Sequence, residues 1–295
     1  MLLTGHAAAQ TQVVAPTPAA ESEPSREPKP AEPAEPVRTT FAVDPVVDTA
    51  VIGVSASLAF VLDQFKGTGE MRPQPIPPDF DRDDLFAIDQ VAVEIEHRPS
   101  ARTWSNVGVS AAMAYAVLDS VLSGYREQSV QTGLVDFVLY AESLAITQAL
   151  ANVVKYAVRR PRPAAYAELE QHRDDPDYTN TNTDSALSFF SGHAATSATL
   201  GATATYLAFA RSPASWRPWV TLFGATGVTT FVSVQRVRAG EHFPSDVIVG
   251  AIVGAGVGVM VPHLHRTEDA KQRPLWVGYA PLERGGHGLT LSGNF

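Results

Sequence analysis

The chain has 295 residues and no cysteine, and its formal net charge is −9, from 22 lysines and arginines against 31 aspartates and glutamates. The lack of cysteine excludes a disulfide scaffold, thiolate metal sites and a cysteine nucleophile. The acidic balance argues against a nucleic-acid partner, because nucleic-acid binding relies on basic surface. The apolar fraction of 45% is that of an ordinary folded protein, so a globular or membrane-associated protein remains.

Residues 1–45 differ in composition from the rest of the chain. From Thr11 to Pro45 the sequence is mostly Pro, Ala, Glu and Val, which predicts a disordered, extended linker because it can bury little apolar surface. Ahead of it, Ala7-Ala8-Ala9 resembles the end of a secretory signal, although the apolar core of a signal is nearly absent. An alanine-rich flexible terminus explains the same residues. We therefore interpret residues 1–45 as a signal-like remnant followed by a linker.

Residues 46–265 have a helical character and form the predicted main domain. Six apolar, Ala/Gly-rich runs, separated by Pro- and charge-rich loops, predict an all-α, six-helix bundle. The runs are residues 47–62, 104–124, 134–154, 185–210, 217–235 and 246–262. Only 185–210 and 217–235 reach the uncharged length of about 18 residues expected of a bilayer span. Residues 266–295 lack helical character and predict one or two short strands or an ordered tail.

The first chemically notable segment follows the third run. Lys155 and Arg162 lie seven residues apart, so both can face one side of a helix end, and Pro161 and Pro163 are expected to stop that helix. Arginine matches phosphate oxygens with a planar fork of donors, and lysine adds a point charge. Taken alone, a basic helix end is also explained as a solvated cap that complements the helix dipole.

Two further segments lie where helices are expected to begin. Ser191-Gly192-His193 precedes the fourth run, and such a start offers backbone N–H groups and the positive end of the helix dipole to an anion. His242 lies just before the last run and Asp246 in its first turn, so the carboxylate can orient the imidazole ring. An ordinary serine cap and an N-terminal aspartate with a surface histidine are the simpler explanations of each segment alone.

Read in order, the segments are Lys-x6-Arg-Pro, Ser-Gly-His and Arg-x5-His-x3-Asp. This pattern resembles the type 2 phosphatidic acid phosphatase superfamily (PAP2), which includes bacterial acid phosphatases and vanadium haloperoxidases. The chain departs from the family pattern at Phe190, where Pro is usual, and at Gln235, where Ser is usual. The matching positions are Lys155, Arg162, Pro163, Ser191, Gly192, His193, Arg236, His242 and Asp246.

The resemblance implies a fold and a set of roles. It implies a six-helix PAP2-type domain over residues 46–265 that hydrolyses a lipid phosphate, an isoprenoid diphosphate or a small phosphomonoester. By this resemblance His242 attacks phosphorus, Asp246 orients it, and His193 protonates the leaving group. By the same resemblance, the phosphate is held by three cationic side chains, Lys155, Arg162 and Arg236, and by Ser191 and Gly192 at the start of a helix.

Several alternatives stay open at this stage. We expect no metal and no cofactor, with vanadate as an inhibitor; in a haloperoxidase, vanadate would be the cofactor. A catalytically silent helical membrane scaffold is the non-enzymatic alternative. His263 and His265 end the last run, where a cation complements the helix dipole, and a metal pair there is the minor alternative.

The location follows from the same observations. We expect a bacterial cell-envelope protein, with an inner-membrane protein whose site faces outward favoured over a soluble periplasmic one. The expected partner is a phosphorylated lipid or a small phosphate ester, and the sequence carries no signal for an oligomeric state.

Overall fold

The computed structural model describes residues 41–67, 74–77, 80–172, 174–175, 178, 182–267, 276–281 and 287–292. The predicted signal remnant and almost all of the predicted linker lie outside these residues. Much of the C-terminal tail does so too.

Six long helices form the domain, and they confirm the predicted all-α, six-helix core. They are α1 (Pro45–Gln64), α3 (Pro99–Arg126), α4 (Val130–Val158), α6 (Gly192–Arg211), α7 (Arg217–Arg238) and α8 (Pro244–Leu264). Short elements connect them: α2 (Val91–Glu94), α5 (Pro163–Gln171) and the 3-10 turns η1 (Phe65–Gly67), η2 (Arg82–Asp84) and η3 (Thr183–Ala186). Strands β1 (Trp276–Pro281) and β2 (His287–Ser292) pair antiparallel, as expected for the tail.

The helix boundaries differ from the apolar runs at two places. The run at 185–210 starts before its helix, because Ser191 is the N-cap of α6 and the apolar residues before it belong to a buried loop. Helix α4 ends at Val158, where Arg159 adopts a left-handed conformation with φ of 50°. Pro163 then begins α5 instead of only ending α4. Arg162 is therefore the N-cap of α5 and does not share a helix with Lys155.

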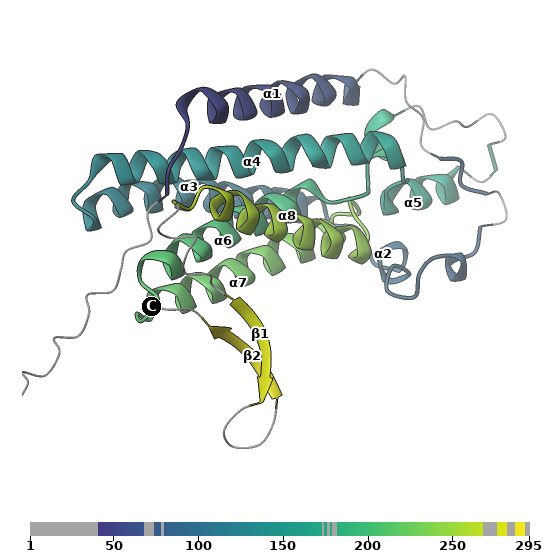
Figure 1. Ribbon diagram of the computed structural model, residues 1–295. Helices are drawn as coiled ribbons and strands as arrows, with labels where there is room; N and C mark the ends of the chain where they lie inside the picture. The colour runs from purple at the N-terminus through teal and green to yellow at the C-terminus, as the bar shows by residue number, and fades with distance from the viewer. Residues whose placement is uncertain are drawn as a thin grey trace, which may run out of the picture. The chain divides into compact units, whose positions relative to one another are not determined.

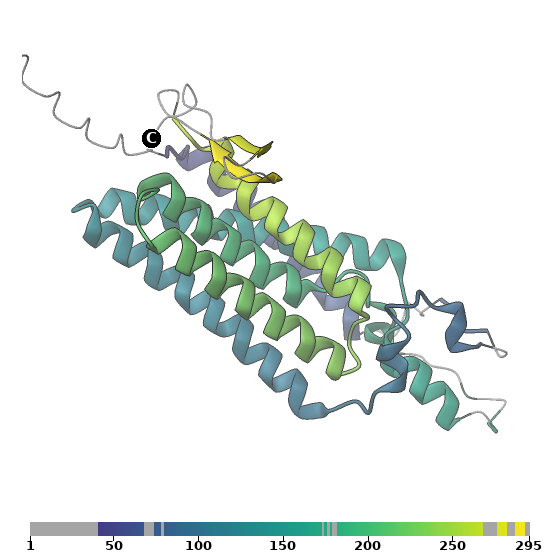
Figure 2. The ribbon, with the colours of Figure 1, turned by 90° about the horizontal axis from the view of Figure 1, so that it is seen from below.

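Helix α6 is the centre of the domain. It packs against α3, α4, α7 and α8, and Figures 1 and 2 both show α6, α7 and α8 running side by side. Helix α8 approaches closely because it carries glycines on the shared face. A Cβ on Gly250 would lie 2.6 Å from the carbonyl oxygen of Ser191, and the hydroxyl of Thr199 donates to the carbonyl oxygen of Gly254 at 2.9 Å. This contact fixes the start of α6 beside the start of α8.

The alternating directions of the helices gather one set of helix ends. Helices α1, α4 and α7 end where α3, α6 and α8 begin, since successive long helices run antiparallel. Helices α2 and α5 lie at this end (Figure 1). The three segments singled out in the sequence therefore meet at one end of the bundle.

Four helical stretches are long and apolar enough to cross a membrane. They are Pro45–Gln64, Pro99–Arg126, Val130–Gln171 and Pro244–Leu264. This finding corrects the expectation that residues 185–210 and 217–235 are the two candidate spans. Those runs contain few charges, but their many Thr, Ser, Gly and Ala residues make them less apolar than the other helices. The four stretches support a membrane protein.

Candidate functional site

A cavity of about 440 Å³ lies at the end of the bundle where the three segments meet. The cavity is lined by residues from the ends of α1, α4 and α7 and from the starts of α3 and α6. Its charged lining consists of five cationic side chains, Lys66, Arg102, Lys155, Arg162 and Arg236, and three carboxylates, Asp63, Asp184 and Glu241. The cavity is therefore net positive in a chain whose formal charge is −9, and it favours an anion.

Lys155, Arg162 and Arg236 are the three predicted phosphate-binding cations, and all three line the cavity. Each is buried, with 8%, 8% and 5% of its surface exposed. The guanidinium of Arg162 donates to the carboxylate of Asp184 at 2.7 Å, which orients it from η3. Buried cations held by the fold can stabilise the charge of a phosphoryl group without rearranging.

The start of α6 places Gly192 and His193 on the same cavity. A Cβ on Gly192 would lie 3.5 Å from the ammonium nitrogen of Lys155, so the backbone passes close to that cation. His193 Nε2 lies 2.8 Å from Asn106 Oδ1 on α3. Burial lowers the pKa of His193 to about 3, and the nearby cations act in the same direction. Ser191 is fully buried and caps α6 through the N–H of Ala194, at 3.4 Å, and it does not line the cavity.

His242 is buried, with 1% of its surface exposed, and it is not among the residues that line the cavity. Its Nδ1 lies 2.6 Å from the carbonyl oxygen of Ser188. Because a carbonyl only accepts, Nδ1 carries the proton and Nε2 keeps its lone pair. Burial, followed by Arg236 and Arg162, lowers the pKa of His242 well below its usual value. The ring is therefore neutral, as a nucleophile must be.

Asp246 contacts the ring less directly than the sequence predicts. Its Oδ2 lies 3.9 Å from His242 Nδ1, beyond hydrogen-bond distance. That oxygen instead accepts from the hydroxyl of Ser188 at 2.5 Å and from the backbone N–H of Phe243 at 2.9 Å. Asp246 thus fixes the loop whose Ser188 carbonyl holds the imidazole.

Arg160 extends this support and has no role in the sequence prediction. It donates to Asp246 Oδ1 at 2.6 Å and to Asp89 Oδ2 at 2.8 Å. Asp89, fully buried, also accepts from the backbone N–H of Ser245 at 2.8 Å. Arg160 lies between Lys155 and Arg162 in the sequence. The sequence does not show that its side chain stays outside the cavity lining and binds Asp246 and Asp89 instead.

Glu241 is the main cavity residue that sequence reasoning missed. Its carboxylate, 2% exposed, pairs with the guanidinium groups of Arg162 and Arg102 and accepts from Arg236 at 3.1 Å. It directly precedes His242, and this adjacency was the available signal. Arg102 and Asn106 were missed as well, because α3 carries no local motif that marks them.

The donor set of the cavity suits an anion better than a metal cation. Each carboxylate in the lining is paired with a cationic side chain: Asp63 with Lys66, Asp184 with Arg162, and Glu241 with the arginines. A phosphate or a vanadate would meet hydrogen-bond donors, whereas a metal ion would have to displace these ion pairs.

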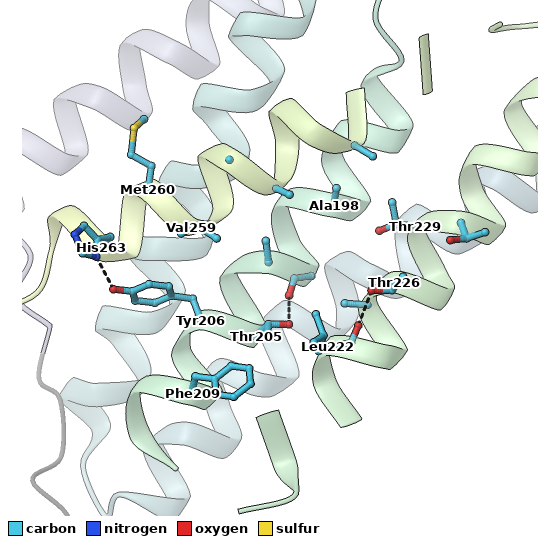
Figure 3. A pocket seen from close by; sticks show the side chains of 17 residues that line it. Ala198, Thr205, Tyr206, Phe209, Leu222, Thr226, Thr229, Val259, Met260 and His263 are labelled. Carbon is cyan, nitrogen blue, oxygen red and sulfur yellow. Dashed lines mark hydrogen bonds between the residues drawn. The ribbon is translucent and has the colours of Figure 1, made fainter. Parts of the chain in front are cut away.

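A second, larger hollow lies between α6, α7 and α8. It measures about 990 Å³ and is lined mainly by small and apolar side chains, among them Ala198, Phe209 and Leu222 (Figure 3). At its far end the hydroxyl of Tyr206 and His263 Nδ1 lie 2.9 Å apart.

Comparison with known proteins finds similarity over the part of the chain that contains the three segments. Residues 136–270 match the model of the PAP2 superfamily. The decaprenylphosphoryl-5-phosphoribose phosphatase of Mycobacterium tuberculosis is 33% identical over 117 residues, which cover 39% of this chain and 54% of that protein. Phospholipid phosphatase 1 of Rattus norvegicus is 28% identical over 154 residues, covering 43% of this chain and 52% of that protein. The chain thus matches about half the length of these relatives, and the resemblance to PAP2 is confirmed.

A solved structure is also similar. The transmembrane PAP2-type phosphatidylglycerolphosphate phosphatase of Bacillus subtilis aligns with a TM-score of 0.44 and 19% identity, over 74% of this chain and 94% of that chain.

Proposed function

We propose that this protein is a metal-independent phosphatase that hydrolyses a phosphate ester through a phosphohistidine. The observation that carries the proposal is the convergence of Lys155, Arg162 and Arg236 on one cavity, with buried His242 directly after Glu241 of its lining. Three buried cations can stabilise the equatorial oxygens of a phosphoryl group in the manner of an oxyanion hole.

The reaction follows from the atoms that this geometry provides. His242 Nε2 attacks phosphorus, the P–O bond to the leaving group breaks, and His193 gives its proton to the leaving oxygen. A bound phosphate dianion offsets the neighbouring cations and so favours the protonated form of His193. Water then attacks the phosphohistidine with His193 as base, which releases phosphate and restores His242.

The substrate class is proposed to be a lipid phosphate. The relatives named above are phosphatases of a phospholipid and of a decaprenyl-linked sugar phosphate, and four helical stretches are apolar enough to cross a membrane. Isoprenoid diphosphates and small phosphomonoesters are the alternative substrates. We place the protein in a bacterial inner membrane with the cavity facing outward.

Phosphate release in the presence of EDTA tests the chemistry. Wild type, His242→Ala and the control His172→Ala, a half-buried histidine outside the cavity, are assayed with an aryl phosphate and with phosphatidate in mixed micelles. We expect turnover in wild type and control and none in His242→Ala. Loss of one cation, as in Arg236→Ala, should lower the rate about 10²–10³-fold.

Three outcomes would contradict the proposal. Turnover that requires a metal, or that survives His242→Ala, would remove the histidine mechanism. Halide oxidation with vanadate and peroxide, without phosphate release, would indicate a haloperoxidase. No reaction in either assay, and none with an isoprenoid diphosphate, would leave the silent scaffold. Preference for phosphatidate over the aryl phosphate would support the lipid substrate.

A further inference from the structure

Three side chains from three helices meet at a second place in the molecule. Asp48 lies in the first turn of α1, Glu142 in α4, and His265 is the C-cap of α8. His265 Nε2 lies 3.3 Å from Asp48 Oδ1 and 3.3 Å from Glu142 Oε2. One ligand atom of each residue lies within 4.8 Å of the others. We refer to these three residues as the Asp48–Glu142–His265 triad.

The hydrogen bond on the other ring nitrogen sets the chemistry of His265. Its Nδ1 lies 2.8 Å from the carbonyl oxygen of Val261. A carbonyl only accepts, so Nδ1 carries a proton. Without an ion, Nε2 also carries a proton and donates it to Asp48 Oδ1 at 3.3 Å; loss of that proton leaves a neutral ring whose Nε2 lone pair can bind a metal ion. A backbone carbonyl on the second nitrogen is the usual support of a metal-binding histidine. With Nε2 deprotonated, the triad offers three electron-pair donors to one ion.

Burial makes this arrangement costly without a cation. Asp48 and Glu142 are 5% and 6% exposed, and among the described residues Asp48 Oδ2 and Glu142 Oε2 have no hydrogen-bond partner. Among the described residues neither carboxylate pairs with a lysine or arginine; the only ion-pair partner of each is His265. Buried carboxylates need an opposite charge. An imidazolium would supply one positive charge for two negative ones, whereas a divalent ion balances both.

We propose that the Asp48–Glu142–His265 triad binds a divalent metal ion of the zinc type. Tetrahedral ligands at about 2.0–2.1 Å from zinc lie roughly 3.3 Å from one another, which is the separation seen for His265 Nε2 and each carboxylate. Carboxylate and imidazole donors suit zinc, and three protein ligands leave a fourth position for water.

The ion would fasten the first helix of the domain to its core. Beside the triad, the backbone N–H of Ala42 donates to the carbonyl oxygen of His265 at 2.9 Å, and Phe41 pairs with Arg266. Thirteen residues separate Glu142 from Lys155 on α4, or about 20 Å at 1.5 Å per residue. The site is therefore separate from the phosphate cavity.

Zinc binding by the detergent-purified full chain tests the proposal. A tag without histidines is used, the protein is stripped with EDTA, and Zn²⁺ is titrated by calorimetry while the thermal midpoint is followed. We expect one Zn²⁺ per chain and a midpoint several degrees higher with zinc than without. Asp48→Asn and His265→Ala should each weaken binding about 100-fold or more, because loss of an outer-shell partner alone costs 10–100-fold.

His263→Ala is the matched control. His263 lies two residues from His265 but bonds to Tyr206 instead of the triad, so its loss should leave zinc binding unchanged. Stoichiometric binding that persists in both triad variants, or no binding by stripped wild type, would overturn the proposal. If the variants do not fold, the zinc titration of the stripped wild type decides by itself whether the proposal holds. Phosphate release in EDTA is independent of this result, so the two proposals can fail separately.

Discussion

The Glu241 carboxylate occupies donors that a phosphate group would use. It pairs with Arg162 and Arg236, the two guanidinium groups at the phosphate cavity that the sequence predicts as phosphate ligands. An anion entering the cavity therefore competes with this carboxylate and meets its negative charge. Glu241 also directly precedes His242, so the competition takes place beside the proposed nucleophile.

We predict that Glu241→Gln tightens the binding of inorganic phosphate and vanadate. The amide keeps the shape of the side chain but removes the charge that pairs with the arginines, and a hydrogen bond to a charged group is worth about 1.5–3 kcal/mol. Inhibition constants should fall roughly tenfold, since 1.4 kcal/mol corresponds to that factor. Glu96→Gln, an exposed carboxylate outside the cavity, is the control. Unchanged or weaker inhibition would show that Glu241 positions the arginines instead of competing for them.

Buried, neutral His242 also predicts how stability depends on pH. Its pKa is lowered in the folded protein, by burial first and then by Arg236 and Arg162, while the unfolded chain titrates near 6.5. Below about pH 6.5 the unfolded state binds one more proton than the folded state, so stability falls as the pH falls. Between pH 6.5 and 5 this single group should cost at most about 2 kcal/mol, at 1.36 kcal/mol per unit.

Thermal unfolding at pH 7 and pH 5, in buffer without phosphate, measures this effect. His242→Gln should lose part of the acid destabilisation that wild type shows, because glutamine does not titrate. The control Ser100→Ala, at an exposed residue without a titrating side chain, should keep the wild-type dependence. Equal acid sensitivity in wild type and His242→Gln would mean that His242 is protonated in the folded protein near neutral pH.

At the scale of elements, the close contact of α6 and α8 positions the catalytic segments. A Cβ on Gly254 would lie 2.8 Å from the Cα of Ala195, in the backbone of α6. We predict that Gly254→Ala destabilises the protein by about 1–3 kcal/mol, the usual cost of overpacking. Gly256→Ala, on the same helix with nothing within 4 Å of its Cβ, should be neutral or stabilise by up to about 1 kcal/mol. Thermal midpoints in detergent compare the two, and equal effects would exclude a packing origin.

The sequence predicted the helices well because helix-period apolar runs and capping residues are local signals. Ser191 and Pro244 mark the starts of α6 and α8 where the structure has them. The three segments meet because each lies at an end of an antiparallel helix, which also follows from helix order. Residues 185–210 and 217–235 were wrongly predicted as the candidate membrane spans. That prediction counted charges only, whereas their Thr, Ser and Gly residues keep the mean hydropathy of these runs low.

Tertiary partners were beyond the reach of sequence reasoning. Asn106 and Arg102 lie on α3 without a motif and reach the cavity only through the packing of α3 on α6. The partner of the His242 ring is a backbone carbonyl, that of Ser188, and backbone groups leave no trace in residue identity. The predicted direct bond from Asp246 fails for the same reason: Ser188 lies between the two side chains in the hydrogen-bond network.

At the scale of the whole molecule, the two ends of the bundle differ in chemistry. One end holds the net-positive cavity, and the other holds the Asp48–Glu142–His265 triad beside the start of α1. If the apolar stretches cross a membrane, the two ends face different compartments. The proposed outward orientation then places the phosphate cavity on the outer side and the turn between α6 and α7 on the inner side.

The absence of cysteine makes this orientation directly measurable. We predict that Ser100→Cys, exposed at the start of α3, reacts with a membrane-impermeant maleimide on intact spheroplasts. Ala214→Cys, exposed in the turn between α6 and α7, should react only after lysis. Unmodified wild type, without any thiol, provides the background.

The reverse labelling pattern would mean that the cavity faces the inside of the cell, and labelling of neither residue before lysis would place both ends of the bundle inside the cell. Release of the protein from cells while spheroplasts are formed would instead identify a soluble periplasmic phosphatase, in which the apolar faces of α1 and α8 need a protein partner rather than lipid.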